Sequence, residues 1–227
     1  MQTVHSKAEP PRRKRRRFQF SLRSLLIVVT LVGIVCGWLG SKIDRKVKER
    51  KLIEAIVKRR GVVWYDFQCA DSNGRVIPDA KPPGPDWLRS LLGENFFSEV
   101  RAVLIAPGGD SDLQLLAALP RLQSAALGGT TIIDNGLAHL KGLTQLEYLD
   151  LQRTGITDIG LRHLTGLMRL QELKLDETKV TDAGLANLSR LPRLQWLTLF
   201  GTNVTDAGVK TLQKSLPNCT VLHECHR

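Results

Sequence analysis

The residues that could do chemistry are few, and their spacing does not favour it. The only cluster of metal-capable side chains, near the C-terminus, consists of Cys219, His223, Cys225 and His226. This spacing does not match the paired cysteines and histidines of a structural zinc site. We therefore predict no metal site. The cluster is instead interpreted as a frayed tail or as a local disulfide between Cys219 and Cys225, which sequence alone cannot separate.

Other motifs of catalysis are missing as well. The sequence has no Gly-x-Ser-x-Gly, phosphate-loop or dinucleotide fingerprint. The glycine pair in Pro107-Gly108-Gly109-Asp110 lacks the Lys-Ser/Thr that a phosphate loop needs, so it predicts a turn into a helix. His139 and His163 stand at equivalent places of a repeat, with no third ligand beside them in sequence. We predict no catalytic residue, no cofactor and no enzymatic activity.

A repeat of 24 residues organises the chain. Copies start at Leu122, Leu146, Leu170 and Leu194. Within the second copy, Leu149 and Leu151 are two residues apart, so they share one face of a short strand. The later apolar residues, Leu161, Leu164 and Leu167, have the spacing of one helix face. One strand and one helix cannot bury these leucines alone, so the copies must stack and fold as one array.

A Thr-Asp pair precedes the helix in the second, third and fourth copies, as in Thr157-Asp158. There a side-chain oxygen can accept from a free N–H, and a carboxylate suits the positive end of the helix. The pairs recur because each caps a helix, so we do not interpret them as catalytic carboxylates.

The motif Leu-x-x-Leu-x-Leu-x-x-Thr-x-Val/Ile-Thr-Asp-x-Gly-Leu resembles the leucine-rich-repeat family, and is most similar to its bacterial form with 24-residue repeats. The resemblance covers about Val100 to the C-terminus. It implies an α/β solenoid of about five repeats, a short curved array with parallel strands on the concave face and helices on the convex face. The position that usually holds Asn holds Thr here, and we expect its hydroxyl to satisfy loop backbone groups; these residues are Thr130, Thr154, Thr178 and Thr202.

A membrane anchor is predicted near the N-terminus. Residues 24–41 carry no charge, and 18 helical residues span roughly 27 Å, close to the thickness of a hydrocarbon core. The basic run Arg12–Arg17 and the aromatic Trp38 suit its flanks, and the whole resembles the membrane anchor of many such bacterial proteins. A cleaved signal peptide is the alternative; we favour an uncleaved anchor because no Ala-x-Ala-like site follows.

Charge and glycine spacing suggest orientation and partners. The first 60 residues hold 17 Lys and Arg against 4 Asp and Glu, a net charge of +13, which leaves −2 for the remainder. The predicted solenoid is therefore not basic, and we expect no nucleic-acid partner. The denser basic flank is N-terminal, which favours a cytoplasmic N-terminus and repeats outside the cytoplasm. Gly33 and Gly37 form a Gly-x-x-x-Gly that could pair two membrane helices in a homodimer.

These observations divide the chain into six segments. We predict a basic disordered N-terminus (1–23), a transmembrane helix (24–41), a charged stalk helix ended by Gly61 (42–60), a capping region (61–99), the repeats with a degenerate first copy (100–218), and a C-terminal cap and tail (219–227).

The predicted function is protein binding on the concave face. Residues between the buried leucines should project from the strands, and exposed Trp and Tyr near Arg are typical of interface hot spots. For these residues the alternative is that Trp196 and Phe200 pack on one another or under the terminal cap. A separate alternative for the function is a structural or self-assembling cell-envelope protein with no specific client. The candidate contact residues are Tyr148, Asp150, Gln152, Arg153, Glu172, Lys174, Asp176, Trp196, Thr198 and Phe200.

Overall fold

The computed structural model describes residues 22–68, 80–106 and 108–224. The disorder predicted for the N-terminus falls almost wholly on residues 1–21, outside the described residues. The chain divides into two compact units, Met1–Arg45 and Lys46–Arg227. Helix α1 (Leu22–Lys58) belongs to both.

The first unit holds the apolar part of α1, which begins Leu25-Leu26-Ile27-Val28. Leu25–Lys58 is long and apolar enough to cross a membrane, with a mean hydropathy of 2.0 in its most apolar window; a signal sequence would meet the same criteria. Two hydroxyl groups in the uncharged part of α1 bond to the helix itself. Thr30 Oγ1 donates to the Leu26 carbonyl at 3.0 Å, and Ser41 Oγ donates to the Gly37 carbonyl at 3.0 Å. Hydroxyls satisfied in this way suit an apolar surrounding.

The predicted membrane helix and stalk helix form one uninterrupted helix. It ends at Lys58, and the N–H of Gly61 just beyond donates to the Ile56 carbonyl at 2.9 Å. Arg60 takes the left-handed conformation of a helix C-cap, with φ 65°. A Cβ on Gly61 would lie 2.5 Å from Ile56 Cγ2, so only glycine fits this turn.

The second unit is built on a seven-stranded sheet in sequential order. The first strand, β1 (Val62–Tyr65), pairs antiparallel with β2 (Val100–Leu104). Every later pair is parallel, through β3 (Ser124–Ala126), β4 (Tyr148–Asp150), β5 (Glu172–Lys174), β6 (Trp196–Thr198) and β7 (Thr220–Leu222).

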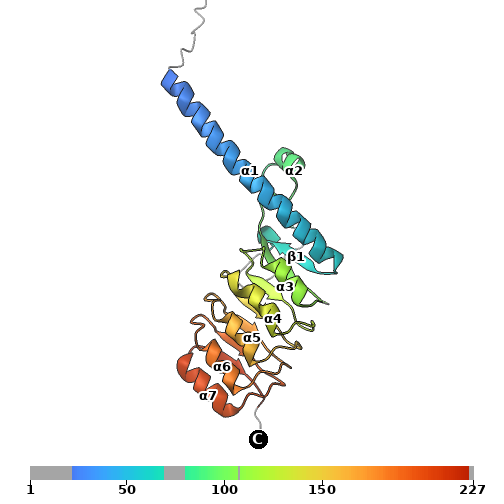
Figure 1. The fold of residues 1–227 in the computed structure, drawn as a ribbon, viewed down its shortest axis with the longest axis vertical. Helices are drawn as coiled ribbons and strands as arrows, with labels where there is room; N and C mark the ends of the chain where they lie inside the picture. Colours follow the sequence, from blue (N-terminus) through green and yellow to red (C-terminus); the bar gives the residue numbers. More distant parts are fainter. Residues whose placement is uncertain (1–21, 69–79, 107, 225–227) are drawn as a thin grey trace, which may run out of the picture. The chain divides into compact units, whose positions relative to one another are not determined.

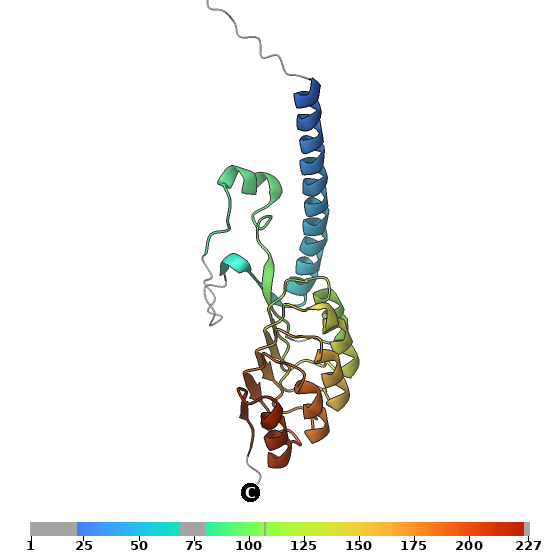
Figure 2. The ribbon, with the colours of Figure 1, turned by 90° about the vertical axis from the view of Figure 1, so that its left-hand side faces the viewer.

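A helix follows each strand from β2 to β6, and these helices lie side by side along one face of the sheet (Figures 1 and 2). They are α3 (Asp110–Leu116), α4 (Asp134–Leu137), α5 (Asp158–Leu161), α6 (Asp182–Leu188) and α7 (Asp206–Ser215). A short 3-10 helix, η1 (Asp66–Gln68), follows β1. Two others continue α4 and α5: η2 (Ala138–Gly142) and η3 (Arg162–Leu164). Helix α2 (Asp86–Leu92) lies in the capping region. This is the predicted α/β solenoid of five strand–helix units.

The leucines of the repeat fill one continuous core between the sheet and the helices. Leu149, Leu151, Leu161 and Leu164 are all 0% exposed, and one cluster of buried residues runs from Ile56 to Cys219. Burying a leucine side chain contributes about 1.5–3 kcal/mol, so the stacked repeats supply the main stabilisation.

A threonine in each repeat closes the loop after the strand, as predicted. Thr154 Oγ1 donates to the Leu151 carbonyl at 2.6 Å, and the hydroxyls of Thr130, Thr178 and Thr202 make the same bond in their own repeats. All four side chains are buried, so each bond satisfies a carbonyl that water cannot reach.

The aspartate of the Thr-Asp pair has a role that sequence reasoning missed. Only the threonines cap their helices directly, as when Thr157 Oγ1 accepts from Ile159 N–H. The aspartates of three successive repeats, Asp134, Asp158 and Asp182, instead bond to the next repeat. Asp158 accepts from Thr181 N–H at 2.8 Å and from Thr181 Oγ1 at 2.7 Å. Asp134 and Asp182 repeat the bonds with Thr157 and Thr205. We call this series the aspartate ladder.

The aspartate ladder also explains the glycine of the motif. A Cβ on Gly184 would meet the carboxylate of Asp158 inside van der Waals contact, and Gly160 and Gly208 stand in the same relation to Asp134 and Asp182. A carboxylate can reach across the repeat boundary only where the next helix carries no side chain.

The two ends of the array are closed differently. At the N-terminal end β1 covers the edge of β2, Ile56 of α1 enters the core at 2% exposure, and Arg59 pairs with Asp112 of α3. At the C-terminal end β7 is the last strand. His223 follows it at the position that a core leucine holds in earlier repeats, with its Nδ1 3.6 Å from Asp206 Oδ1. Cys219 is buried, and its possible partner Cys225 lies outside the described residues.

Candidate protein-binding face

The sheet surface opposite α3–α7 is the candidate site, and we call it the open face. Strand residues alternate between the core and this face. The register aligns two rows across the strands. One row runs Ser124, Tyr148, Glu172, Trp196, and the other runs Ala126, Asp150, Lys174, Thr198. The structure therefore brings the predicted strand residues together as two continuous rows.

A charged group occupies the centre of the open face. Lys174 Nζ lies 3.5 Å from Glu172 Oε1 and 5.3 Å from the centre of the Tyr148 ring. Burial raises the pKa of the Tyr148 hydroxyl. Burial works against the charged form of Lys174, but its bond to Tyr148 and the neighbouring carboxylates outweigh this and raise its pKa. Lys174 is therefore a fixed cation at neutral pH.

Asp150 and Thr198 are more deeply buried than the other candidate residues, and each is 7% exposed. Asp150 accepts from the Gln152 N–H at 3.0 Å and from Gln152 Nε2 at 3.2 Å. Thr198 donates to Asp176 at 2.6 Å, and Asp176 also accepts from Phe200 N–H at 2.8 Å. These residues orient their neighbours rather than present themselves to a partner.

The exposed edge of the open face carries an ion pair. Arg153 Nε and a terminal guanidinium nitrogen lie 2.9 and 2.8 Å from Glu177 Oε1. This bond raises the pKa of Arg153 and lowers the pKa of Glu177. Both residues have a left-handed backbone, with φ 55°. The same turn is filled by Gly129 and Gly201 in neighbouring repeats, so the two charged residues occupy positions that favour glycine.

Two aromatic side chains are exposed at the C-terminal side of the face. Trp196 is 43% exposed and Phe200 is 41% exposed. Together with Tyr148 and Arg153 they form the residue types that dominate protein interfaces. Neither aromatic is buried under the terminal cap.

An apolar part of the open face was missed by sequence analysis. Because β1 pairs with β2, Trp64 aligns with Ala102 and Val62 with Leu104. These residues extend the two rows through Ser124 and Ala126. Val62 is 43% exposed. Only the pairing of β1 with β2 shows that Val62 and Trp64 belong to this face.

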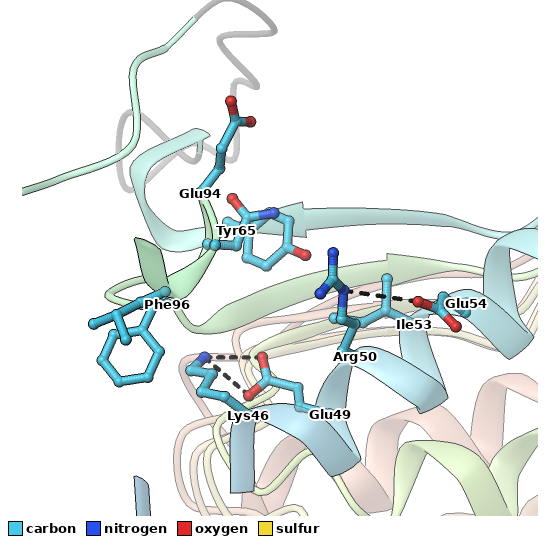
Figure 3. Close-up of a pocket in the computed structure, with 11 residues that line it drawn as sticks. Lys46, Glu49, Arg50, Ile53, Glu54, Tyr65, Glu94 and Phe96 are labelled. Carbon is cyan, nitrogen blue, oxygen red and sulfur yellow. Dashed lines mark hydrogen bonds and ion pairs between the residues drawn. The ribbon is translucent and has the colours of Figure 1, made fainter. Parts of the chain in front are cut away.

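A pocket of about 420 Å³ lies between α1 and the capping region (Figure 3), and none of the candidate contact residues lines it. Lys46 closes one side, paired with Glu49 at 2.9 Å and bonded to the Ser98 carbonyl. Burial raises the pKa of Glu49, although its bond to Lys46 works against this. The other lining residues include Arg50, Ile53, Tyr65, Leu92 and Phe96.

No group of three or more metal-capable side chains occurs within the described ranges. His139 and His163 lie on the helix side of the sheet, in η2 and η3; His139 is exposed and His163 is partly buried. Burial and the nearby charge of Lys141 lower the pKa of His163.

Strands and helices alternating around such a core define a leucine-rich-repeat solenoid. Residues 144–204 match the family model described as "Leucine rich repeat". This match supports assignment of the repeats to the leucine-rich-repeat family. No curated protein matches the chain.

Solved structures with similar folds come from bacteria and plants. Internalin C2 from Listeria monocytogenes is 28% identical, with a TM-score of 0.43, over 49% of this chain and 46% of that chain. A leucine-rich-repeat protein of Leptospira interrogans is 23% identical, with a TM-score of 0.39, over 48% and 27%. The leucine-rich-repeat ectodomain of a receptor kinase from Arabidopsis thaliana is 14% identical, with a TM-score of 0.43, over 79% and 92%. The chain thus spans less than half of the two bacterial proteins.

Proposed function

We propose that this protein is a membrane-anchored binding module that holds a protein partner on its open face. Leucine-rich-repeat folds commonly mediate protein–protein interaction. The observation that carries the proposal is the pair of exposed aromatics, Trp196 and Phe200, beside the fixed charges of Arg153, Lys174 and Glu177. Aromatic anchors flanked by oriented polar groups are the usual source of binding energy at interfaces.

Rigidity is the second part of the proposal. The side chains of the open face stand on strands whose loops are closed by buried threonine bonds and whose repeats are joined by the aspartate ladder. A preorganised surface loses little conformational entropy when a partner binds.

The anchor is proposed from α1. Its apolar stretch, its internally bonded hydroxyls and Lys42 over Trp38 at 5.2 Å suit a helix that crosses a bilayer. We propose an N-terminus in the cytoplasm and repeats outside it. A Cβ on Gly33 or Gly37 would meet nothing within 4 Å, so this face leaves room for a second helix to approach closely.

The test is site-specific photo-crosslinking with the full chain in its native membrane. A photoreactive phenylalanine analogue replaces Phe200, and in a matched control it replaces Ile159, which is 58% exposed on α5. We expect one discrete cross-linked protein from position 200 and none from position 159. Equal yields at the two positions would contradict a specific face. A product made only of two copies of this chain would favour the self-assembling alternative.

Orientation is tested separately with a protease and a C-terminal tag. We expect the tag to be cut once the outer barrier is opened, while the protein stays in carbonate-washed membranes. Cutting only after the inner membrane is breached would reverse the proposed orientation.

A further inference from the structure

Helix α2 of the capping region presents an apolar face that the fold does not use. Trp87 and Leu91 are four residues apart, so they lie on the same side of the helix. They are 68% and 73% exposed, and no residue of α2 is buried. Large apolar side chains this exposed usually mark an interaction surface.

The side of α2 opposite Trp87 and Leu91 makes contacts with the rest of the capping region and with the pocket. Leu92 and Gly93 at the end of α2 line the pocket of the capping region. Gly93 N–H donates to the Arg89 carbonyl at 2.8 Å, and Arg89 bonds to the Pro82 carbonyl and pairs with Asp86. The helix is thus tied on one side and exposed on the other.

The opposite wall of the same pocket is formed by Lys46 and Glu49. Only residues 42–45 separate Lys46 from the end of the uncharged stretch at Ser41. Five steps of chain reach at most about 18 Å in any conformation. If the uncharged stretch spans a bilayer, Lys46 therefore lies within about 18 Å of the end of that stretch, and the end of α2 lines the same pocket as Lys46.

The positive charge of residues 42–60, which follow the uncharged stretch, is complementary to an anionic bilayer surface. Residues 42–60 hold nine Lys and Arg against three Asp and Glu, a net charge of +6. Basic residues beside a membrane are attracted to anionic headgroups by about 1 kcal/mol each. Tryptophan is enriched at the boundary between headgroups and acyl chains.

We propose that Trp87 and Leu91 of α2 insert into the headgroup region of the membrane in which α1 is anchored. The inference rests on the proposed anchor. It gives the capping region a second contact with the lipid surface, which would limit how the solenoid tilts on its anchor.

The test uses the full chain reconstituted in vesicles of phosphatidylcholine and phosphatidylglycerol, with lipids brominated near the headgroup end of their chains. Three variants each keep one of the four tryptophans: Trp38, Trp87 or Trp196. Bromine quenches only tryptophans in the bilayer, so we expect an about twofold loss of emission at Trp87 and none at Trp196.

The Trp38 variant separates the two proposals. Quenching at Trp38 without quenching at Trp87 overturns the insertion of α2 and leaves the anchor intact. No quenching at Trp38 overturns the anchor and the inference together. To guard against misfolding of the single-tryptophan variants, Trp87→Phe in the natural chain should remove a quenched component that Trp196→Phe retains. The same quenching in both would also overturn the inference.

Discussion

At the scale of single residues, the aspartate ladder makes the repeat specific. Asp158 is one of the carboxylates that accept two hydrogen bonds from the following repeat. Such bonds to a charged group contribute about 1.5–3 kcal/mol each when formed away from water. The motif thus encodes contacts between repeats as well as the start of each helix.

The first prediction concerns the glycine beside this carboxylate. In Gly184→Ala the new methyl group would collide with Asp158 and approach Leu161. We expect a loss of about 1–3 kcal/mol in the free energy of unfolding, because overpacking outweighs the gain in helix propensity. Gly142→Ala is the control, since its Cβ would meet nothing within 4 Å. Denaturant unfolding of both variants checks this, and equal stability would show that Asp158 can move aside.

The second prediction concerns Cys219. Burial raises the pKa of this thiol from 9.0 to about 11, so the thiolate that alkylating agents require is scarce at pH 8. We expect iodoacetamide to modify Cys219 far more slowly in the folded chain than in denaturant, measured by peptide mass spectrometry. The raised pKa also means that the folded state holds this proton more tightly. Its contribution to stability is complete below pH 9 and is lost as the pH rises toward 11. Rapid labelling of the folded chain would show that the C-terminal end opens.

At the scale of elements, each strand is followed by a turn with one left-handed residue. Gly129 and Gly201 occupy it without strain, whereas Arg153 and Glu177 adopt it as an ion pair. The turn directs residues 153 and 177 onto the exposed edge of the open face. Local backbone geometry therefore sets part of the candidate site.

The third prediction isolates the cost of this conformation. Gly129 has φ 71°, and a Cβ there would meet nothing within 4 Å. Gly129→Ala should therefore lower stability by about 1 kcal/mol, the cost of a left-handed alanine. Its control is again Gly142→Ala. A neutral result would mean that this turn changes conformation when glycine is replaced.

Much of this arrangement could be predicted from sequence, because the leucine spacing determines both strands and helices. The period of 24 correctly placed the buried leucines, the threonine bonds and the five strand–helix units. The pairing of β1 could not be predicted, since hydrogen bonding between distant strands leaves no local pattern. For the same reason the partner of Asp158, which is 23 residues away, was missed. At the candidate site, the leucine spacing showed which residues project from the strands, but it could not show that Asp150 and Thr198 are buried by their neighbours.

At the scale of the whole molecule, the array is a row of units in which each repeat contacts its neighbours. Its ends differ. The N-terminal end is closed by β1 and by Ile56 and Arg59 of α1, whereas the C-terminal end has β7 and His223. In a solenoid the free energy of unfolding is close to a sum of terms for the repeats and for the interfaces between them. A local defect should therefore destabilise mainly the repeats between it and the end that has the weaker cap.

The fourth prediction follows from this asymmetry. Leu173 of β5 is 0% exposed in the middle of the array, and Leu173→Ala should cost about 2–5 kcal/mol through the cavity that it leaves. We expect hydrogen exchange of α6, α7 and β7 to accelerate strongly, while β2 and β3 keep their protection because the N-terminal cap still supports them. The control is Glu172→Ala on the open face of the same strand, which removes an exposed pair with Lys174 but no core volume. Uniform acceleration across all strands would show that the solenoid unfolds as one cooperative unit, and the open face would then be only as stable as the whole.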